Sequence, residues 1–109
     1  MTDAEPRVWG LDDDALAAYP TVYRSDLLAG QVAIISGGGT GLGRAMAYLF
    51  ARLGAEVVIC SRRQENLEAT ATGIRERLGR SIDTMAMTIR DPDAVAALMD
   101  RVWSKHGRL

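Results

Sequence analysis

Apolar positions follow two patterns along the chain, short unbroken runs and longer segments with apolar residues three or four positions apart. Unbroken runs occur at residues 32–35 and 57–60. Runs of this kind are typical of strands that are buried on both faces of a parallel sheet. Residues 81–89 predict a third strand, although the methionines at 85 and 87 suit a helix as well as a sheet.

Three longer segments have the helical spacing: residues 42–53, residues 64–78, and a segment that begins after Asp91 and Pro92. Their inward positions are expected to be Leu42, Ala45, Met46, Leu49, Phe50 and Leu53; Leu67, Ala71, Ile74 and Leu78; and Val95, Leu98, Met99, Val102 and Trp103. A glycine follows each segment, where helices often end in a left-handed residue: Gly54, Gly79 and Gly107. Within the second segment, Gly73 is expected to weaken the helix.

The order of these elements from residue 29 to residue 109 is β-α-β-α-β-α. Alternation of this kind predicts an α/β fold with a parallel sheet and right-handed crossovers. A complete doubly wound Rossmann-type sheet needs a second half. Residues 29–109 are therefore expected to form only the first half of a dinucleotide-binding domain.

Residues 1–28 are expected to form an N-terminal arm. Aspartates at positions 12–14 favour a short helix at residues 12–19, with the acids at its positive end. One interpretation is a solvated arm. The apolar residues of the stretch favour the other, an arm that packs on the domain or on a neighbouring subunit: Trp9, Leu11, Leu16, Tyr19 and Tyr23.

Composition excludes several classes of function. A hydrophobic content of 48%, a charged content of 25% and a net charge of −1 are ordinary for a globular protein and disfavour a nucleic-acid partner. With one cysteine, Cys60, and one histidine, His106, neither a disulfide nor a metal cluster is expected within one chain. No apolar stretch approaches the length of a membrane span, and the acids near the N-terminus do not resemble a leader. The cytoplasm is therefore the expected location.

Residues 36–43, Ser-Gly-Gly-Gly-Thr-Gly-Leu-Gly, carry the strongest chemical signal. Glycines permit a sharp turn from strand to helix and the close approach of a phosphate to the backbone. The helix that follows offers unpaired N–H groups and the positive end of its dipole to an anion. A tight turn without a ligand is the alternative. The surrounding strand, helix and second strand favour a dinucleotide pyrophosphate as the ligand.

These residues resemble the N-terminal half of a short-chain dehydrogenase/reductase. The family's cofactor loop reads Thr-Gly, three variable residues and Gly-x-Gly, and residues 36–43 match it with serine for threonine. Residues 28–33, 90–93 and 105–109 also resemble family landmarks. The glycine loop together with Ser-Arg after the second strand is most similar to the 2,4-dienoyl-CoA reductase branch. That branch implies reduction of an enoyl- or dienoyl-CoA, while the wider family implies interconversion of an alcohol and a carbonyl.

The resemblance also implies a set of cofactor-binding residues. Those around the pyrophosphate and the adjoining ribose would be Gly37, Gly39, Thr40, Gly41, Leu42 and Gly43. Ile89 would lie along the adenine. Thr88 stands where many members have an aspartate that accepts a hydrogen bond from the adenine amino group, which puts affinity for the adenine in question.

At the end of the second strand, NAD-selective relatives have an acid, whereas this chain has Ser61, Arg62 and Arg63. A hydroxyl and two guanidinium groups favour the 2′-phosphate of NADP. Arginines that simply decorate a surface loop are the alternative.

The family's catalytic serine, its Tyr-x-x-x-Lys motif and its Asn-Ala-Gly turn do not occur in these 109 residues. No catalytic residue is therefore assigned. Two functions follow, an NADP-dependent oxidoreductase that acts on a small molecule, with this chain as its cofactor-binding half, or a truncated, non-catalytic nucleotide-binding or association module. The first is favoured for the whole protein and the second for the isolated 109 residues. Family enzymes commonly form dimers and tetramers, so a homo-oligomer is expected.

Overall fold

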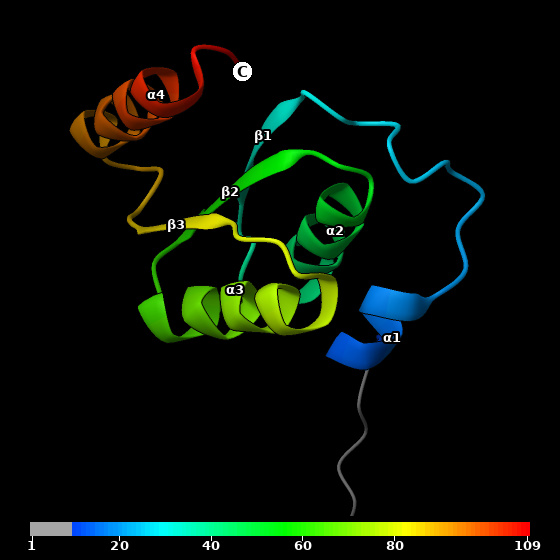
Figure 1. Ribbon diagram of the computed structural model, residues 1–109. Helices are drawn as coiled ribbons and strands as arrows, with labels where there is room; N and C mark the ends of the chain where they lie inside the picture. Colours follow the sequence, from blue (N-terminus) through cyan, green and yellow to red (C-terminus); the bar gives the residue numbers. More distant parts are fainter. Residues whose placement is uncertain (1–9) are drawn as a thin grey trace, which may run out of the picture.

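A computed structural model describes residues 10–109, and its strands form one parallel sheet (Figure 1). The strands lie in the order β1 (Val32–Ser36), β2 (Glu56–Ser61) and β3 (Asp83–Ala86). Val32 lies opposite Glu56 at one end of the first pair, and Val58 lies opposite Asp83 in the second. The strand β3 is shorter at both ends than the predicted 81–89. Met87 still donates a backbone hydrogen bond to the Ser61 carbonyl at 2.8 Å, and residues 87–90 line a cavity described below.

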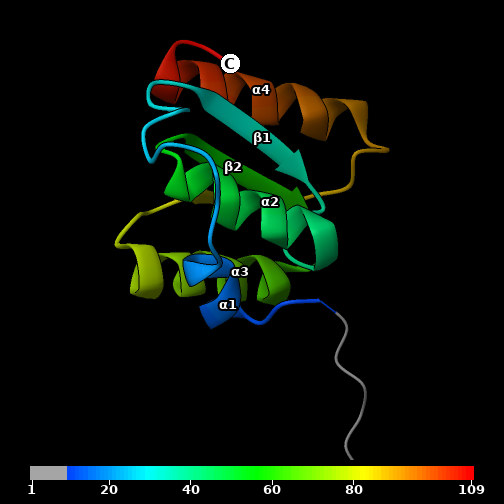
Figure 2. The same cartoon turned by 90° about the vertical axis from the view of Figure 1, so that its right-hand side faces the viewer.

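Helices cover both faces of the sheet (Figures 1 and 2). On one face lie α2 (Gly41–Arg52) and α3 (Gln64–Leu78), and α1 (Asp13–Ala18) packs outside them. The other face carries α4 (Pro92–His106), whose buried Leu98 and Val102 meet Val58 of β2. The first β-α-β-α-β-α half of a doubly wound fold is therefore confirmed.

Local signals set the helix ends as predicted. Asp91 caps α4 by accepting a hydrogen bond from the Asp93 backbone N–H at 3.0 Å, and Pro92 opens the helix. Gly79 and Gly107 end α3 and α4 with φ of 66° and 69°. Glycine adopts such left-handed angles without the steric cost of a Cβ.

The buried face of α2 matches the predicted one only in part. Leu53 is buried and Phe50 packs against the core, as predicted. The helix buries Ala47, Tyr48 and Ala51, while Leu42 and Met46 are 79% and 37% exposed. The two alanines let the helix approach the sheet and α3 closely, which turns its longer apolar side chains aside.

On α4, Leu98 and Val102 are buried as predicted. Met99 and Trp103, which were expected to point inward, are 41% and 62% exposed. Among the described residues α4 is the only helix on its face of the sheet (Figure 1), so nothing covers the flanks of its apolar stripe.

The described part of the arm packs on the domain, as the second interpretation predicted. Asp12 caps α1 by accepting a hydrogen bond from the Ala15 backbone N–H at 2.8 Å, and Leu28 donates to the Leu53 carbonyl at 2.8 Å. The aromatics are not what holds it, because Tyr19 and Tyr23 stay 58% and 52% exposed. The aliphatic residues Leu16, Ala17 and Leu28 pack against the core, and ion pairs and backbone contacts add to this attachment. Trp9, the other aromatic expected to contribute, lies outside the described residues.

Candidate functional site

The loop between β1 and α2 is held in shape by close backbone packing. Gly37 and Gly41 have φ of 76° and 55°, and the Gly37 N–H donates to the Cys60 carbonyl at 2.8 Å. A Cβ on Gly43 would overlap the Gly37 carbonyl oxygen. The loop therefore needs glycine both for its turns and for the contact between its start and the helix.

The N-termini of α2 and α3 differ from those of the other two helices. Asp12 and Asp91 cap α1 and α4 with their side chains. Thr40 and Arg63, the N-cap residues of α2 and α3, make no side-chain cap hydrogen bond. The first amides of α2 and α3 are thus left for another acceptor, and the dipole of each helix favours an anion.

A cavity of about 360 Å³ opens at the carboxyl ends of the strands. It is lined by Ser36, Gly37, Ser61, Arg62, Met87, Thr88, Ile89 and Arg90. Apolar Met87 and Ile89 offer surface to a flat ring, and the Ile89 side chain is 65% exposed. The Thr88 hydroxyl oxygen accepts a hydrogen bond from the Arg90 N–H at 3.2 Å, and its own proton stays available to a ligand.

A second, more polar cavity of about 190 Å³ lies beside the glycine loop. It is lined by Gly39, Thr40, Ser61, Arg62, Arg63 and Asn66. Arg62 borders both cavities. The Arg63 guanidinium lies 3.8 Å from the Glu65 carboxylate, which neutralises part of its charge. Both arginines border the smaller cavity, and Glu65 competes with a phosphate for Arg63, so Arg62 is the better placed of the two to bind one there.

Around these two cavities the structure brings together eight of the residues named from the sequence: Gly37, Gly39, Thr40, Ser61, Arg62, Arg63, Thr88 and Ile89. Gly41 and Leu42 border a different, largely apolar cavity of about 420 Å³ against the arm. Gly43 supports the loop rather than lining these cavities.

Sequence reasoning missed Asn66. It lies in the first turn of α3, and its Cβ would lie 2.9 Å from a Cβ built on Gly39. The sequence offered one hint that Asn66 belongs to the site. Asn66 lies three residues after Arg63, at the start of a helix that follows a strand.

Cys60 takes no part in this chemistry. The thiol is buried in β2, and burial raises its pKa. Since the thiolate is the reactive form, this cysteine is expected to be inert.

Within residues 10–109, no group of histidine, cysteine or acidic side chains is arranged to hold a metal ion. The helices of this part of the chain are all too short or too polar to cross a bilayer.

Comparison with known proteins identifies the family to which this chain belongs. The family model described as short chain dehydrogenase matches residues 31–109. A probable 2,4-dienoyl-CoA reductase 3 of Caenorhabditis elegans is 42% identical over 87 residues, which is 80% of this chain and 28% of that protein. Relatives whose names place them in the peroxisome match up to 100% of this chain and 37% of their own length. The chain thus spans about a third of the length of these relatives.

Comparison with solved structures agrees with this family assignment. A citronellol catabolism dehydrogenase of Pseudomonas aeruginosa superposes with a TM-score of 0.77 at 40% identity, over 82% of this chain and 37% of the other. A metagenomic short-chain oxidoreductase in complex with NADP has a TM-score of 0.70 at 37% identity, over 74% of this chain and 36% of the other.

Proposed function

Because this chain belongs to the short-chain dehydrogenase family, whose solved members include an NADP complex, we propose that it supplies the cofactor-binding half of an NADP(H)-dependent oxidoreductase. The observation that carries the proposal is the arrangement of the two uncapped helix N-termini, with Arg62 between the two cavities beside them. When bound, the cofactor supplies a hydride donor or acceptor. The residues described here bind and orient it.

In this proposal residues 29–109 form the cofactor-binding half and residues 1–28 the arm. The pyrophosphate and the adjoining ribose lie against Gly37, Gly39, Thr40, Gly41, Leu42 and Gly43. The α2 amides that Thr40 leaves uncapped donate to the pyrophosphate oxygens. Close approach is possible because Gly37 and Gly41 carry no Cβ.

The adenine lies in the larger cavity, with Ile89 against the ring and the Thr88 hydroxyl within reach of its polar edge. The 2′-phosphate lies in the smaller cavity among Ser61, Arg62 and Arg63. The α3 N-terminus and the Asn66 amide add donors there.

Arg62→Ala tests this placement. Charge-assisted hydrogen bonds to phosphate contribute about 1.5–3 kcal/mol, so NADP affinity is expected to fall by roughly 10- to 100-fold while NAD affinity stays within about twofold. Arg63→Ala is the matched control. It should weaken NADP binding less than Arg62→Ala does, because Arg63 already forms an ion pair with Glu65. Titration of the whole protein with both cofactors measures this. Equal affinity of the unaltered protein for NAD and NADP would contradict the proposed selectivity.

For the substrate we propose an enoyl- or dienoyl-CoA, which the similarity to a probable 2,4-dienoyl-CoA reductase supports. Interconversion of an alcohol and a carbonyl is the second candidate, and the similarity to a citronellol catabolism dehydrogenase favours it. NADPH oxidation by the whole protein, with dienoyl-CoA and with simple carbonyl compounds in parallel, separates the two.

A homo-oligomer and a cytoplasmic location are further proposals. Sedimentation of the whole protein tests the first. Relatives with peroxisomal names make the peroxisome the competing compartment, and imaging of the tagged whole protein tests the second.

A further inference from the structure

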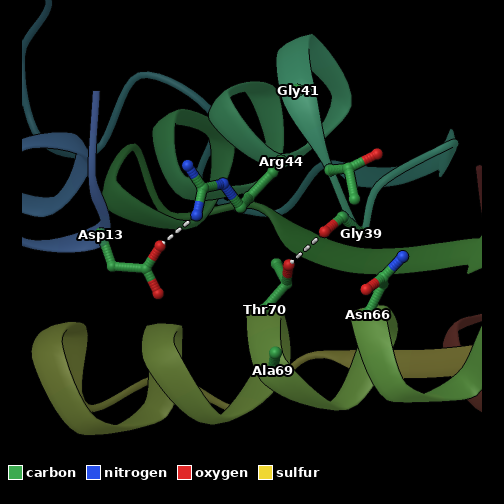
Figure 3. Close-up of a pocket in the computed structure, with 8 residues that line it drawn as sticks. Asp13, Gly39, Gly41, Arg44, Asn66, Ala69 and Thr70 are labelled. Carbon is green, nitrogen blue, oxygen red and sulfur yellow. Dashed lines mark hydrogen bonds and ion pairs between the residues drawn. The ribbon is translucent and has the colours of Figure 1, made fainter. Parts of the chain in front are cut away.

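Asp13 of α1 lies among charged groups from two other helices, and Figure 3 shows one of them, Arg44. One of its carboxylate oxygens accepts a hydrogen bond from Arg44 of α2, and the other lies 3.9 Å from an Arg77 nitrogen on α3. Arg44 also donates to the Leu11 carbonyl of the arm at 2.9 Å. The Asp13 and Arg44 side chains are only 24% and 30% exposed. This pair therefore fixes the arm to the start of α2.

A cavity of about 350 Å³ connects the Asp13–Arg44 pair to the glycine loop (Figure 3). It is lined by Asp13, Gly39, Thr40, Gly41, Arg44, Asn66, Ala69 and Thr70. At the margins of this cavity, two hydrogen bonds add to the close packing of Gly39 on the start of α3 in holding the loop. The Thr70 hydroxyl donates to the Gly39 carbonyl at 3.1 Å, and the Arg44 backbone N–H donates to the Thr40 carbonyl at 3.1 Å.

We propose that Asp13 is a positioning residue for cofactor binding, which makes the N-terminal arm a determinant of affinity. By holding Arg44, it keeps the first turn of α2 and the loop from Gly39 to Gly41 in the conformation that receives the pyrophosphate. This inference rests on the proposed function for the identity of its ligand.

The physical reason is conformational entropy. Without Asp13, the Arg44 side chain regains rotamers and can enter the cavity beside the loop. The loop then occupies more conformations, and the cost of ordering them is subtracted from the binding free energy.

The sign of one substitution separates this role from simple electrostatics. If Asp13 acted only through its charge, Asp13→Asn would remove a negative group near a bound anion and tighten NADP binding. A positioning role predicts the opposite, weaker binding. Arg44→Met weakens binding under either view, so Asp13→Asn is the decisive variant.

The experiment uses the whole protein and compares Asp13→Asn, Arg44→Met and the double variant with Asp14→Asn. Asp14 is the matched control, since it is 83% exposed on the same helix and pairs with Arg77 rather than Arg44. NADP titration is expected to show about three- to tenfold weaker binding for Asp13→Asn at unchanged stoichiometry. The double variant should bind NADP no more weakly than the weaker-binding of the two single variants, because both substitutions remove the same Asp13–Arg44 contact. Asp14→Asn should change affinity less than about twofold.

Amide hydrogen exchange of residues 40–47 without cofactor gives a second readout. Asp13→Asn is expected to speed exchange there. Unchanged exchange, tighter NADP binding, or an equal loss in Asp14→Asn would overturn the inference. If the unaltered protein binds no NADP, the proposed function fails, and the exchange rates still decide whether Asp13 orders the start of α2.

Discussion

Gly73 lies in the middle of α3, where a glycine normally weakens a helix, and the contacts around it explain its presence. A Cβ at this position would overlap the Tyr48 hydroxyl and lie 2.7 Å from an Asp13 carboxylate oxygen. Tyr48 is fully buried. Gly73 thus makes room for the point at which α1, α2 and α3 meet.

Gly73→Ala is expected to destabilise the protein although it raises helix propensity. The propensity gain is about 1 kcal/mol, and overpacking of a buried contact costs about 1–3 kcal/mol. We expect a lower midpoint in denaturant unfolding. Thr72→Ala, the neighbouring position on the same helix, is the control and should gain a few tenths of a kcal/mol at most. A more stable Gly73→Ala protein would show that the contact relaxes easily.

The Tyr48 hydroxyl gives the fold a dependence on alkaline pH. Burial and the Asp13 carboxylate raise the pKa of Tyr48 from 10.0 to about 12, against the opposing effect of Arg77 and Arg44. A raised folded-state pKa means that the neutral phenol is favoured in the folded state. Its stabilising contribution is complete below pH 10 and is lost as the pH rises to 12.

The free energy of unfolding is therefore expected to fall by something on the order of 2 kcal/mol over that range. The Tyr48→Phe protein has no phenol to ionise at this position, so its free energy of unfolding should fall by less over the same pH range. Denaturant unfolding at a series of pH values measures the difference. Parallel curves for the two proteins would contradict the assignment.

At the scale of the element, α2 has an N-terminus that stability alone would not leave uncapped. Thr40 has the extended backbone of an N-cap residue, with φ of −147° and ψ of 164°, yet its side chain makes no cap hydrogen bond. In the proposed function these amides are kept for the pyrophosphate. Stability and binding therefore compete for the same donors.

Thr40→Asp should separate the two effects. An aspartate cap is expected to stabilise the free protein by about 0.5–1 kcal/mol and to weaken NADP binding at least about tenfold, because its charge and its hydrogen bond take the place of the phosphate. Thr40→Asn, which can cap without charge, is the control and should weaken binding less. Thermal unfolding and cofactor titration measure the two effects. Thr40→Asp binding as tight as that of the unaltered protein would exclude the α2 N-terminus as the phosphate site.

At the scale of the whole molecule, the described residues leave two apolar regions incompletely covered. The strand β1 has β2 on one side and no strand on the other within residues 10–109. Met99 and Trp103 of α4 are exposed. An unpaired strand edge and uncovered apolar side chains favour association.

Residues 1–109 alone are therefore expected to form no active enzyme and no stable monomer. They also lack the Tyr-x-x-x-Lys pair that family members use to move the proton that accompanies hydride transfer. Expression of these residues, an assay of NADPH oxidation and unfolding by denaturant test the expectation. Turnover would show that the chemistry lies within this chain, and a cooperative monomeric transition would show that the core suffices by itself.

The amino-acid sequence by itself determined the order of the elements and most of their bounds. The bounds of α3 were predicted to the residue, and Asp91, Gly79 and Gly107 act as the caps that were expected. These signals depend on only a few neighbouring residues, so they can be identified from the sequence without knowledge of the packing. The glycine loop was recognised for the same reason.

Tertiary structure alone decided which groups meet. Asp13 and Arg44 are 31 positions apart and Asp14 and Arg77 are 63 apart, so no local pattern could pair them. The same holds for Asn66 beside the glycine loop and for Tyr48 over Gly73. Apolar spacing selects a helix face only to within a turn, and the close approach that two alanines allow turned α2 toward Tyr48 rather than toward Leu42.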